Sequence, residues 1–223
     1  MKRYAAGMVL GLALVSTAAS AETVYWNTWS SDSAGQILAT GGSVGISFST
    51  TNFRAVVANY PSWTPTSTFS DGNVVANGPV ASNGIMQLTG GTTALNTLTF
   101  SVPVDNPVIA IWSLGQSGVP TTFEFSGATP TLVSGGSNAE YGGASVSVSG
   151  NIVTGVEGNG TVLFEGRFTE LQWTNPVAEN WYGFNVGIMQ AVPEPGQMAL
   201  FGVGLGLLLL LCGGRDARRD PML

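Results

Sequence analysis

Carboxylates are the side chains that could do chemistry in the part of the chain from Glu22 to Val192, which lies between two apolar ends. This part holds ten acidic residues against two cations, Arg54 and Arg167, and it has no His, Cys or Lys. A serine nucleophile therefore lacks its usual base, and zinc lacks its usual ligands. A pair of acids that hydrolyses a glycosidic bond is the chemistry that remains.

The candidate acid pairs are Glu165 with Glu170 and Glu170 with Glu179. Glu165 stands close to Arg167 on what the sequence indicates is a solvent-facing edge, and isolated Glu residues in β-sandwiches are usually surface charge. We therefore expect a protein that is not an enzyme and has no catalytic residue. A carboxylate glycosidase is kept as the second alternative.

Two short acidic clusters could supply oxygen ligands to Ca²⁺: Asp71-Gly72-Asn73 and Asp105-Asn106. Both sequences fit equally well as turns, and no repeated spacing of Asp is present. We expect no metal site and no cofactor, with bound calcium as the alternative. The acidic balance of this part of the chain would repel phosphates, so no nucleic-acid partner is expected.

Aromatic residues are the remaining candidates, because rings that stack on sugar faces are a common way to hold a glycan. Trp63 lies in a proline-flanked loop and is expected to be exposed, and Trp181 and Tyr182 stand together near the end of this part. The rival interpretation is packing: Trp173 and Phe184 would point into the core, and Trp181-Tyr182 would close the end of a sandwich. A carbohydrate-binding module is therefore the first alternative function.

The elements that must position these residues are predicted to be strands. Gly, Ser, Thr, Asn and Val dominate, and apolar residues alternate, as in 98–104, where Leu98, Phe100, Val102 and Val104 would share one face. The rhythm of turns predicts one all-β domain over residues 22–191, an antiparallel β-sandwich of jelly-roll type. A short helix is predicted at 33–39. The predicted strands are residues 23–29, 44–49, 54–59, 84–88, 98–104, 107–114, 121–126, 131–134, 146–148, 152–156, 162–164, 168–174 and 183–189.

The N-terminal end has the features of a signal peptide over residues 1–21. Lys2 and Arg3 precede an apolar run from residue 5 to residue 15, and small residues lead up to Ala21. We expect a helix that is cleaved after Ala21. The alternative, a permanent membrane helix, is disfavoured because the apolar run is too short to span a bilayer comfortably.

The C-terminal end combines three features over residues 192–219: Pro193-Glu194-Pro195, an apolar run, and the arginines Arg215, Arg218 and Arg219. The apolar run predicts a transmembrane helix over about residues 197–213. Its 15 uncharged residues, 198–212, cover about 22 Å as a helix, a short span that flanking residues can complete. The arginines would remain in the cytoplasm, with the body on the opposite side.

These three features, in this order, resemble the PEP-CTERM sorting signal of exported proteins from bacteria that make exopolysaccharide. The resemblance implies that a membrane enzyme of the exosortase type recognises Pro193-Glu194-Pro195 and cuts nearby. Residues 220–223 continue past the arginines, where many such tails stop. The stretches FTELQWTNPVAENWYGFNVG and NPVIAIWSLG also resemble, loosely, β-sandwich bodies of other PEP-CTERM proteins, a likeness that implies no activity.

Taken together, we expect an exported, non-enzymatic protein of the cell surface or the extracellular matrix. Its precursor would be anchored in the inner membrane by the C-terminal helix and processed by an exosortase. Extracellular polysaccharide is the expected surrounding and the expected ligand if the body is a binding module. A plain C-terminal anchor without cleavage is the alternative for the tail.

Overall fold

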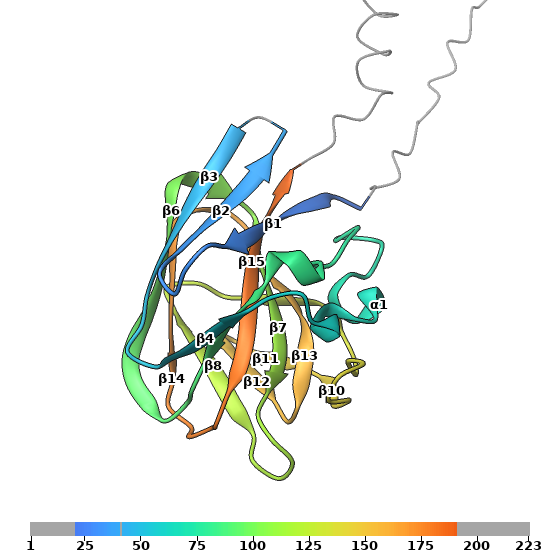
Figure 1. The fold of residues 1–223 in the computed structure, drawn as a ribbon, viewed down its shortest axis with the longest axis vertical. Helices are drawn as coiled ribbons and strands as arrows, with labels where there is room; N and C mark the ends of the chain where they lie inside the picture. Colours follow the sequence, from blue (N-terminus) through green and yellow to red (C-terminus); the bar gives the residue numbers. More distant parts are fainter. Residues whose placement is uncertain (1–20, 41, 191–223) are drawn as a thin grey trace, which may run out of the picture.

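The computed structural model describes residues 21–40 and 42–190 (Figure 1). The predicted signal peptide, apart from Ala21, lies outside the described residues. So do the whole of the predicted sorting segment 192–219, with its tripeptide, helix and arginines, and residues 220–223. In the described ranges no helix is long and apolar enough to cross a membrane.

Strands make up most of the described body, which confirms the predicted all-β class. Two short 3₁₀ turns and one short α-helix lie between β4 and β5. The first 3₁₀ turn and the helix are close in sequence, and the second 3₁₀ turn directly precedes β5. The elements are β1 Thr23–Trp29, β2 Ala34–Ala39, β3 Gly42–Ser49, β4 Phe53–Val57, η1 Pro61–Trp63, α1 Thr66–Phe69, η2 Ala81–Asn83, β5 Ile85–Leu88, β6 Thr92–Asp105, β7 Pro107–Leu114, β8 Thr121–Ser126, β9 Thr131–Gly135, β10 Ala144–Ser145, β11 Ser147–Ser149, β12 Ile152–Gly155, β13 Gly158–Leu163, β14 Arg167–Asn175 and β15 Tyr182–Gln190.

The strands form one large sheet that folds over on itself (Figure 1). Its main path is β10-β13-β7-β15-β1-β2-β3-β6-β14-β8-β12-β11, with β9 beside β13 and the β4–β5 pair beside β15. All described pairings between strands are antiparallel except that of β10 with β13. The first half of β1 pairs with β15 and the second half with β2. β1 therefore carries the sheet from one face of the body to the other.

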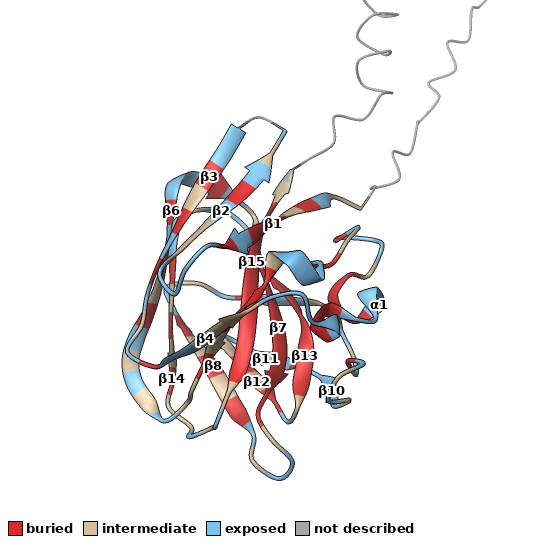
Figure 2. Cartoon of the chain, viewed as in Figure 1, coloured by how far each residue is buried: buried red, intermediate tan, exposed pale blue. Residues whose placement is uncertain are grey.

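The main hydrophobic core lies between these two faces, and β7 is buried on both of its own sides (Figure 2). Ile109 and Ile111 contribute to the main core, whereas Val108, Ala110 and Trp112 belong to a second cluster on the outer side. All eight residues of β7 are buried, and its sequence is apolar except for Ser113, without the alternation of apolar and polar residues that a half-exposed strand shows.

The second cluster is covered by the segment between β4 and β5, which includes η1 and α1. Trp63 and Phe69 from this segment pack edge to face with ring centroids 5.0 Å apart. The Thr161 hydroxyl on β13 donates to the Phe69 carbonyl oxygen at 2.8 Å and fixes α1 to the sheet. Trp63 is only 3% exposed, so the prediction that its ring is exposed is wrong. The proline-flanked loop folds back over the sheet and carries the ring inward.

The helix predicted at 33–39 is also wrong, because β2 occupies this segment. Gly35 pairs with Trp29 on one side and with Ile46 on the other, and Ile37 is fully buried. A Cβ at Gly35 would overlap the side-chain amide of Asn27, so this glycine is required by a close approach between strands. Pairing with the two neighbouring strands, β1 and β3, has outweighed the local preference of this segment for a helix.

Both ends of the described body lie at the same place. Thr23, at the start of β1, pairs with Gln190, at the end of β15, and Figure 1 shows the two strands side by side at one end of the body. The last strand is also central, since β15 has β7, β1 and β5 as neighbours. Because β15 lies between β7 and β1 in the sheet, the path of paired strands is interrupted without it.

Candidate functional site

A cleft that holds two carboxylates lies where four separate segments meet, and we name it the Glu157–Glu179 cleft. Its volume is about 90 Å³, room for several water molecules, and it opens to solvent. The lining residues come from the end of β7 and the turn after it, the loop before β10, the β12–β13 turn and the β14–β15 loop. They are Ser113, Gln116, Tyr141, Glu157, Glu179, Asn180 and Trp181.

Asn159, fully buried on β13, ties three of these segments together. Its Oδ1 accepts hydrogen bonds from the Ser113 backbone N–H at 2.8 Å and from Asn138 Nδ2 at 2.6 Å. Its Nδ2 donates to the carbonyl oxygens of Gly142 at 3.1 Å and Glu157 at 3.0 Å. All the hydrogen-bonding capacity of the amide is directed at the walls of the cleft.

Ser113 enters the cleft because β7 contains a bulge. Ile111 pairs with Gly160 and Leu114 with Gly158, so two residues of β7 stand opposite the single Asn159 of β13. Ser113 has a φ of 53°, a left-handed conformation that non-glycine residues rarely adopt. Bulges redirect side chains in this way, and the Ser113 hydroxyl donates to Glu157 Oε2 at 2.6 Å.

Glu157 is itself held in a left-handed conformation, with a φ of 54°, in the turn before β13. Its N–H donates to the Gly115 carbonyl oxygen at 3.1 Å, and its carbonyl oxygen accepts from the Ala144 N–H at 3.2 Å. Gly143 has a φ of 79°, and a Cβ there would overlap the Glu157 carbonyl. Two backbone positions with positive φ therefore bring this carboxylate to the cleft.

Glu179 reaches the cleft from the β14–β15 loop. Its Oε2 accepts a hydrogen bond from the Gly115 N–H at 2.9 Å, and its own carbonyl oxygen accepts from the Gly90 N–H at 3.1 Å. Burial raises the pKa of Glu179 from 4.5 to about 7, a rise that the Gly115 N–H reduces and the negative charge of Glu157 reinforces. The cleft therefore carries a carboxyl group that titrates near neutral pH.

An aromatic wall completes the cleft. The Trp181 ring centroid lies 4.9 Å from that of Tyr141 and 4.9 Å from that of the buried Trp112. Tyr141 is 49% exposed, so part of its ring faces solvent. The Oδ1 of Asn138 accepts the Tyr141 N–H at 2.7 Å and positions that residue. The Arg54 guanidinium lies over the Trp181 ring, with Cζ 6.0 Å from the centroid.

The predicted binding residues Trp63, Trp181 and Tyr182 are not brought together on one surface. Trp181 lines the cleft, but Trp63 belongs to the second core cluster and Tyr182 is fully buried. The Tyr182 hydroxyl donates to the Thr89 carbonyl oxygen at 3.1 Å, and burial raises the pKa of Tyr182. Trp173 and Phe184 are fully buried, which confirms their predicted core positions.

The carboxylate pairs proposed from the sequence do not form a common cleft. Glu165 and Glu170 are exposed, and Glu170 lines a separate groove with Phe168 and Gln172. Only Glu179 lies in the Glu157–Glu179 cleft. The sequence predicts a turn at Glu157, but no local signal shows that this turn lies against the loop that carries Glu179.

The first predicted calcium loop uses its own carboxylate as a cap. Asp71 Oδ1 accepts backbone N–H donors from Asn73 at 3.2 Å, Val74 at 2.9 Å and Val75 at 2.9 Å. Burial raises the pKa of Asp71, but these N–H groups outweigh it and the net shift is downward. The oxygen that could have bound a cation closes the turn instead.

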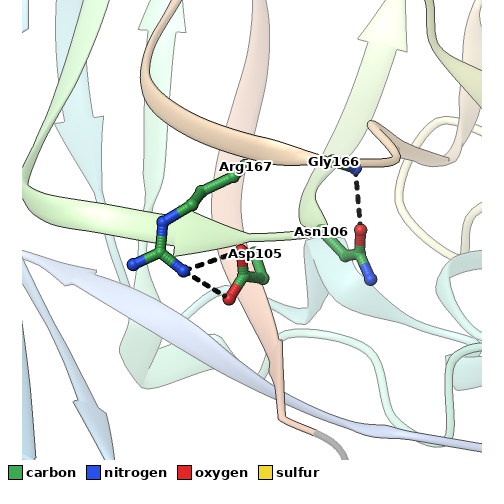
Figure 3. A network of polar contacts seen from close by, with 4 residues as sticks. All are labelled: Asp105, Asn106, Gly166 and Arg167. Carbon is green, nitrogen blue, oxygen red and sulfur yellow. Dashed lines mark hydrogen bonds and ion pairs between the residues drawn. The ribbon is translucent and has the colours of Figure 1, made fainter.

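The second predicted calcium loop connects β6 to β7 and contacts residues at the start of β14, as Figure 3 shows. Arg167 Nη1 lies 3.1 Å from Asp105 Oδ2, and the Gly166 N–H donates to Asn106 Oδ1 at 2.9 Å. Both polar side chains therefore have partners within the protein. In residues 21–40 and 42–190, no three or more His, Cys, Asp or Glu residues gather in a group that could hold a metal ion.

No family model, curated protein or solved structure matches the chain. The chemistry of the Glu157–Glu179 cleft and the pattern of the two chain ends therefore carry the functional conclusion.

The raised pKa of Glu179 predicts a pH dependence of stability. Between pH 4.5 and about 7 the folded protein keeps a proton on Glu179 that the unfolded chain has lost. The contribution of this group to the free energy of unfolding is therefore complete below pH 4.5 and is lost as the pH rises through about 7. Because Glu179 is partly solvated, we expect a loss of about 1–2 kcal/mol in the free energy of unfolding, less than the ~3.4 kcal/mol of the full shift. The charged and titratable groups near it are Glu157, Tyr141, Tyr182 and Arg54.

Urea denaturation of the wild-type protein and Glu179→Gln at pH 4.5 and pH 8 measures this contribution. The variant should be the more stable protein at pH 8 and should show a shallower fall between the two values. Glu170→Gln, an exposed carboxylate, should keep the wild-type slope. Equal slopes for the wild-type protein and Glu179→Gln would contradict the assignment.

Proposed function

We propose that the chain is an exported, non-enzymatic protein of the cell surface or extracellular matrix whose body binds polysaccharide in the Glu157–Glu179 cleft. The body is a single jelly-roll-like β-sandwich over residues 22–191, preceded by a signal peptide and followed by a PEP-CTERM segment. The observation that carries the binding function is the combination of aromatic rings and hydrogen-bonding side chains in one open cleft.

The placement of the chain ends supports export and sorting. Thr23 pairs with Gln190, so the first and last residues of the described sheet are neighbours. β1 begins just after the predicted cleavage site at Ala21, and β15 ends three residues before Pro193. Three residues span at most about 11 Å, so the folded body would stay close to the membrane surface until the tail is cut. A body that has β15 in the interior of its sheet would fold after export, once this strand has crossed.

Mass spectrometry of the protein recovered from cells tests the sorting. We expect an N-terminus at Glu22 and a C-terminus between Pro193 and Gly196. Replacing Glu194 with alanine should leave the C-terminus uncut. An intact Leu223 in the wild-type protein would overturn processing and support the plain membrane anchor, and a retained Met1 would overturn cleavage of the signal.

The chemistry of the cleft suits a sugar. The exposed part of the Tyr141 ring offers a flat apolar surface for the C–H face of a pyranose, and Trp181 extends that surface. The carboxylates of Glu157 and Glu179 accept hydrogen bonds from hydroxyl groups, and Gln116 can both donate and accept. A site of this kind recognises the sugar ring and its polar substituents together.

Calorimetric titration of the full-length protein in detergent with oligosaccharides from bacterial matrix polysaccharides tests the binding function. Tyr141→Ala should weaken binding at least about tenfold, because a stacked ring is a major part of a small contact. Phe53→Ala, which removes a 40% exposed ring on β4, should leave the affinity unchanged.

Two results would overturn this function. Failure to bind any sugar, neutral or charged, would remove the binding module and leave only the sorted surface protein. Shortened oligosaccharides in the mixture after incubation would contradict the non-enzymatic proposal and support the carboxylate glycosidase, with Glu157 and Glu179 as its acid pair.

A further inference from the structure

The charges that line the Glu157–Glu179 cleft are all of one sign. Glu157 and Glu179 are its two charged lining residues, and Tyr141 is its only other titratable one. Arg54, the nearby cation, is not a lining residue: it lies over the Trp181 ring, and its Nη1 donates to the Asn180 carbonyl oxygen at 3.2 Å. An occupant with a positive group would meet two carboxylates and no competing cation in the lining.

Each carboxylate keeps acceptor capacity for such an occupant. Glu157 Oε2 accepts from the Ser113 hydroxyl, and Glu179 Oε2 accepts from the Gly115 N–H. The Thr121 side chain also lies beside the Glu179 carboxyl as a hydrogen-bond partner, and in the described part of the chain no hydrogen bond reaches Oε1 of Glu157. The Oε2 contacts hold the two side chains in place, and their remaining acceptors are available to a donor in the cleft.

The environment favours a cation over a neutral hydroxyl. Glu179 is partly buried beside a second negative charge, and its hydrogen-bond partners, the Gly115 N–H and the Thr121 side chain, are both neutral, so no cation of the lining compensates its ionised form. A charge-assisted hydrogen bond in a partly desolvated site is roughly twice as strong as a neutral one. The Tyr141 ring, which is partly exposed, adds cation–π attraction for a positive group at the wall.

The same aromatic wall favours an occupant that places an apolar ring face beside its positive group. Trp112 lies directly behind it, with its ring centroid 5.5 Å from that of Tyr141 and 4.9 Å from that of Trp181. Trp112 is 2% exposed, and its Nε1 has no hydrogen-bond partner. Ca²⁺ needs six to eight oxygen ligands, more than the two carboxylates supply readily.

We propose that the occupant of the Glu157–Glu179 cleft is a hexosamine unit with a free ammonium group, as in a de-N-acetylated polysaccharide. This inference rests on the proposed sugar-binding function. The ammonium donates to carboxylate oxygens of Glu157 and Glu179, and the pyranose face lies on Tyr141. An N-acetylated unit has no charge at this position and would place a bulky amide between the two carboxylates.

Matched titrations test the inference with the full-length protein at pH 7. The probes are a β-1,4-linked glucosamine tetramer and its fully N-acetylated counterpart, which differ only at the nitrogen. We expect the amino form to bind at least about tenfold more tightly. Glu157→Gln and Glu179→Gln should each remove most of this preference, while Glu170→Gln, which changes the net charge equally, should retain it.

The possible failures are distinguishable. Equal affinity for the two tetramers would overturn the hexosamine inference and leave the sugar-binding function standing. Absence of binding to both would remove the two together. Binding of the amino form that all three Glu→Gln variants weaken equally would show adsorption to an acidic surface and overturn the cleft assignment. Displacement of the amino tetramer by micromolar CaCl₂ would identify the cleft as a metal site and overturn the proposal.

Discussion

Trp173→Ala is expected to lower the free energy of unfolding by about 4 kcal/mol, within the range for large buried aromatic residues. Trp173 is fully buried on β14. Its ring stacks with Phe48 at 5.8 Å and Phe123 at 5.7 Å, and Phe184 meets it edge to face at 5.2 Å. These partners come from β3, β8 and β15, so the ring joins both faces of the folded sheet.

Urea denaturation of the wild-type protein, Trp173→Ala and Trp173→Phe measures the effect. Trp173→Phe should lose about 1–2 kcal/mol, because it leaves a smaller cavity and removes an indole N–H that has no hydrogen-bond partner. The surface variant Leu132→Ala, at a residue that is 40% exposed, should change stability by less than about 0.5 kcal/mol. A loss below about 1.5 kcal/mol for Trp173→Ala would contradict the role of this ring in joining the two faces of the main core.

Asn159→Ala is expected to cost about 3 kcal/mol and to remove ligand binding as well. The substitution leaves the Ser113 N–H, the Asn138 amide and the carbonyl oxygens of Gly142 and Glu157 without their partner. Each buried polar group without a partner costs about 1–3 kcal/mol, and entry of water into the open cleft reduces the sum.

The binding readout separates this effect from simple loss of stability. Under conditions where Asn159→Ala is still folded by circular dichroism, its affinity for an oligosaccharide should fall at least about tenfold, because three walls of the cleft lose their common anchor. Asn73→Ala removes an exposed amide and should match the wild-type protein in stability and binding. Wild-type affinity in a folded Asn159→Ala protein would show that the walls hold their positions without this residue.

The strands could largely be predicted from the sequence, because alternation and turns are local signals. Leu98, Phe100 and Val104 are buried as predicted, but Val102 is 50% exposed. The register between β6 and β14 shifts in this region, between the pairs Val104–Phe168 and Thr99–Glu170. An irregularity of this kind moves side chains to the other face, and alternation alone does not locate it.

The cleft could not be predicted in the same way, because it depends on contacts between distant parts of the chain. Glu157 and Glu179 stand 22 positions apart in the sequence and meet through the pairing of β13 and β15 with β7. Trp63 looked exposed because its loop is rich in proline and polar residues, yet the loop covers the outer side of β7. Of the three predicted rings, only Trp181 lies in the cleft, since its loop precedes a central strand.

A crystal structure of the protein with a bound glucosamine oligomer tests the central claim most directly. We expect one sugar ring on Tyr141, with its nitrogen within hydrogen-bond distance of a carboxylate oxygen of both Glu157 and Glu179. An oligomer bound elsewhere, such as along the groove beside Phe168 and Glu170, with the cleft holding only water, would contradict it.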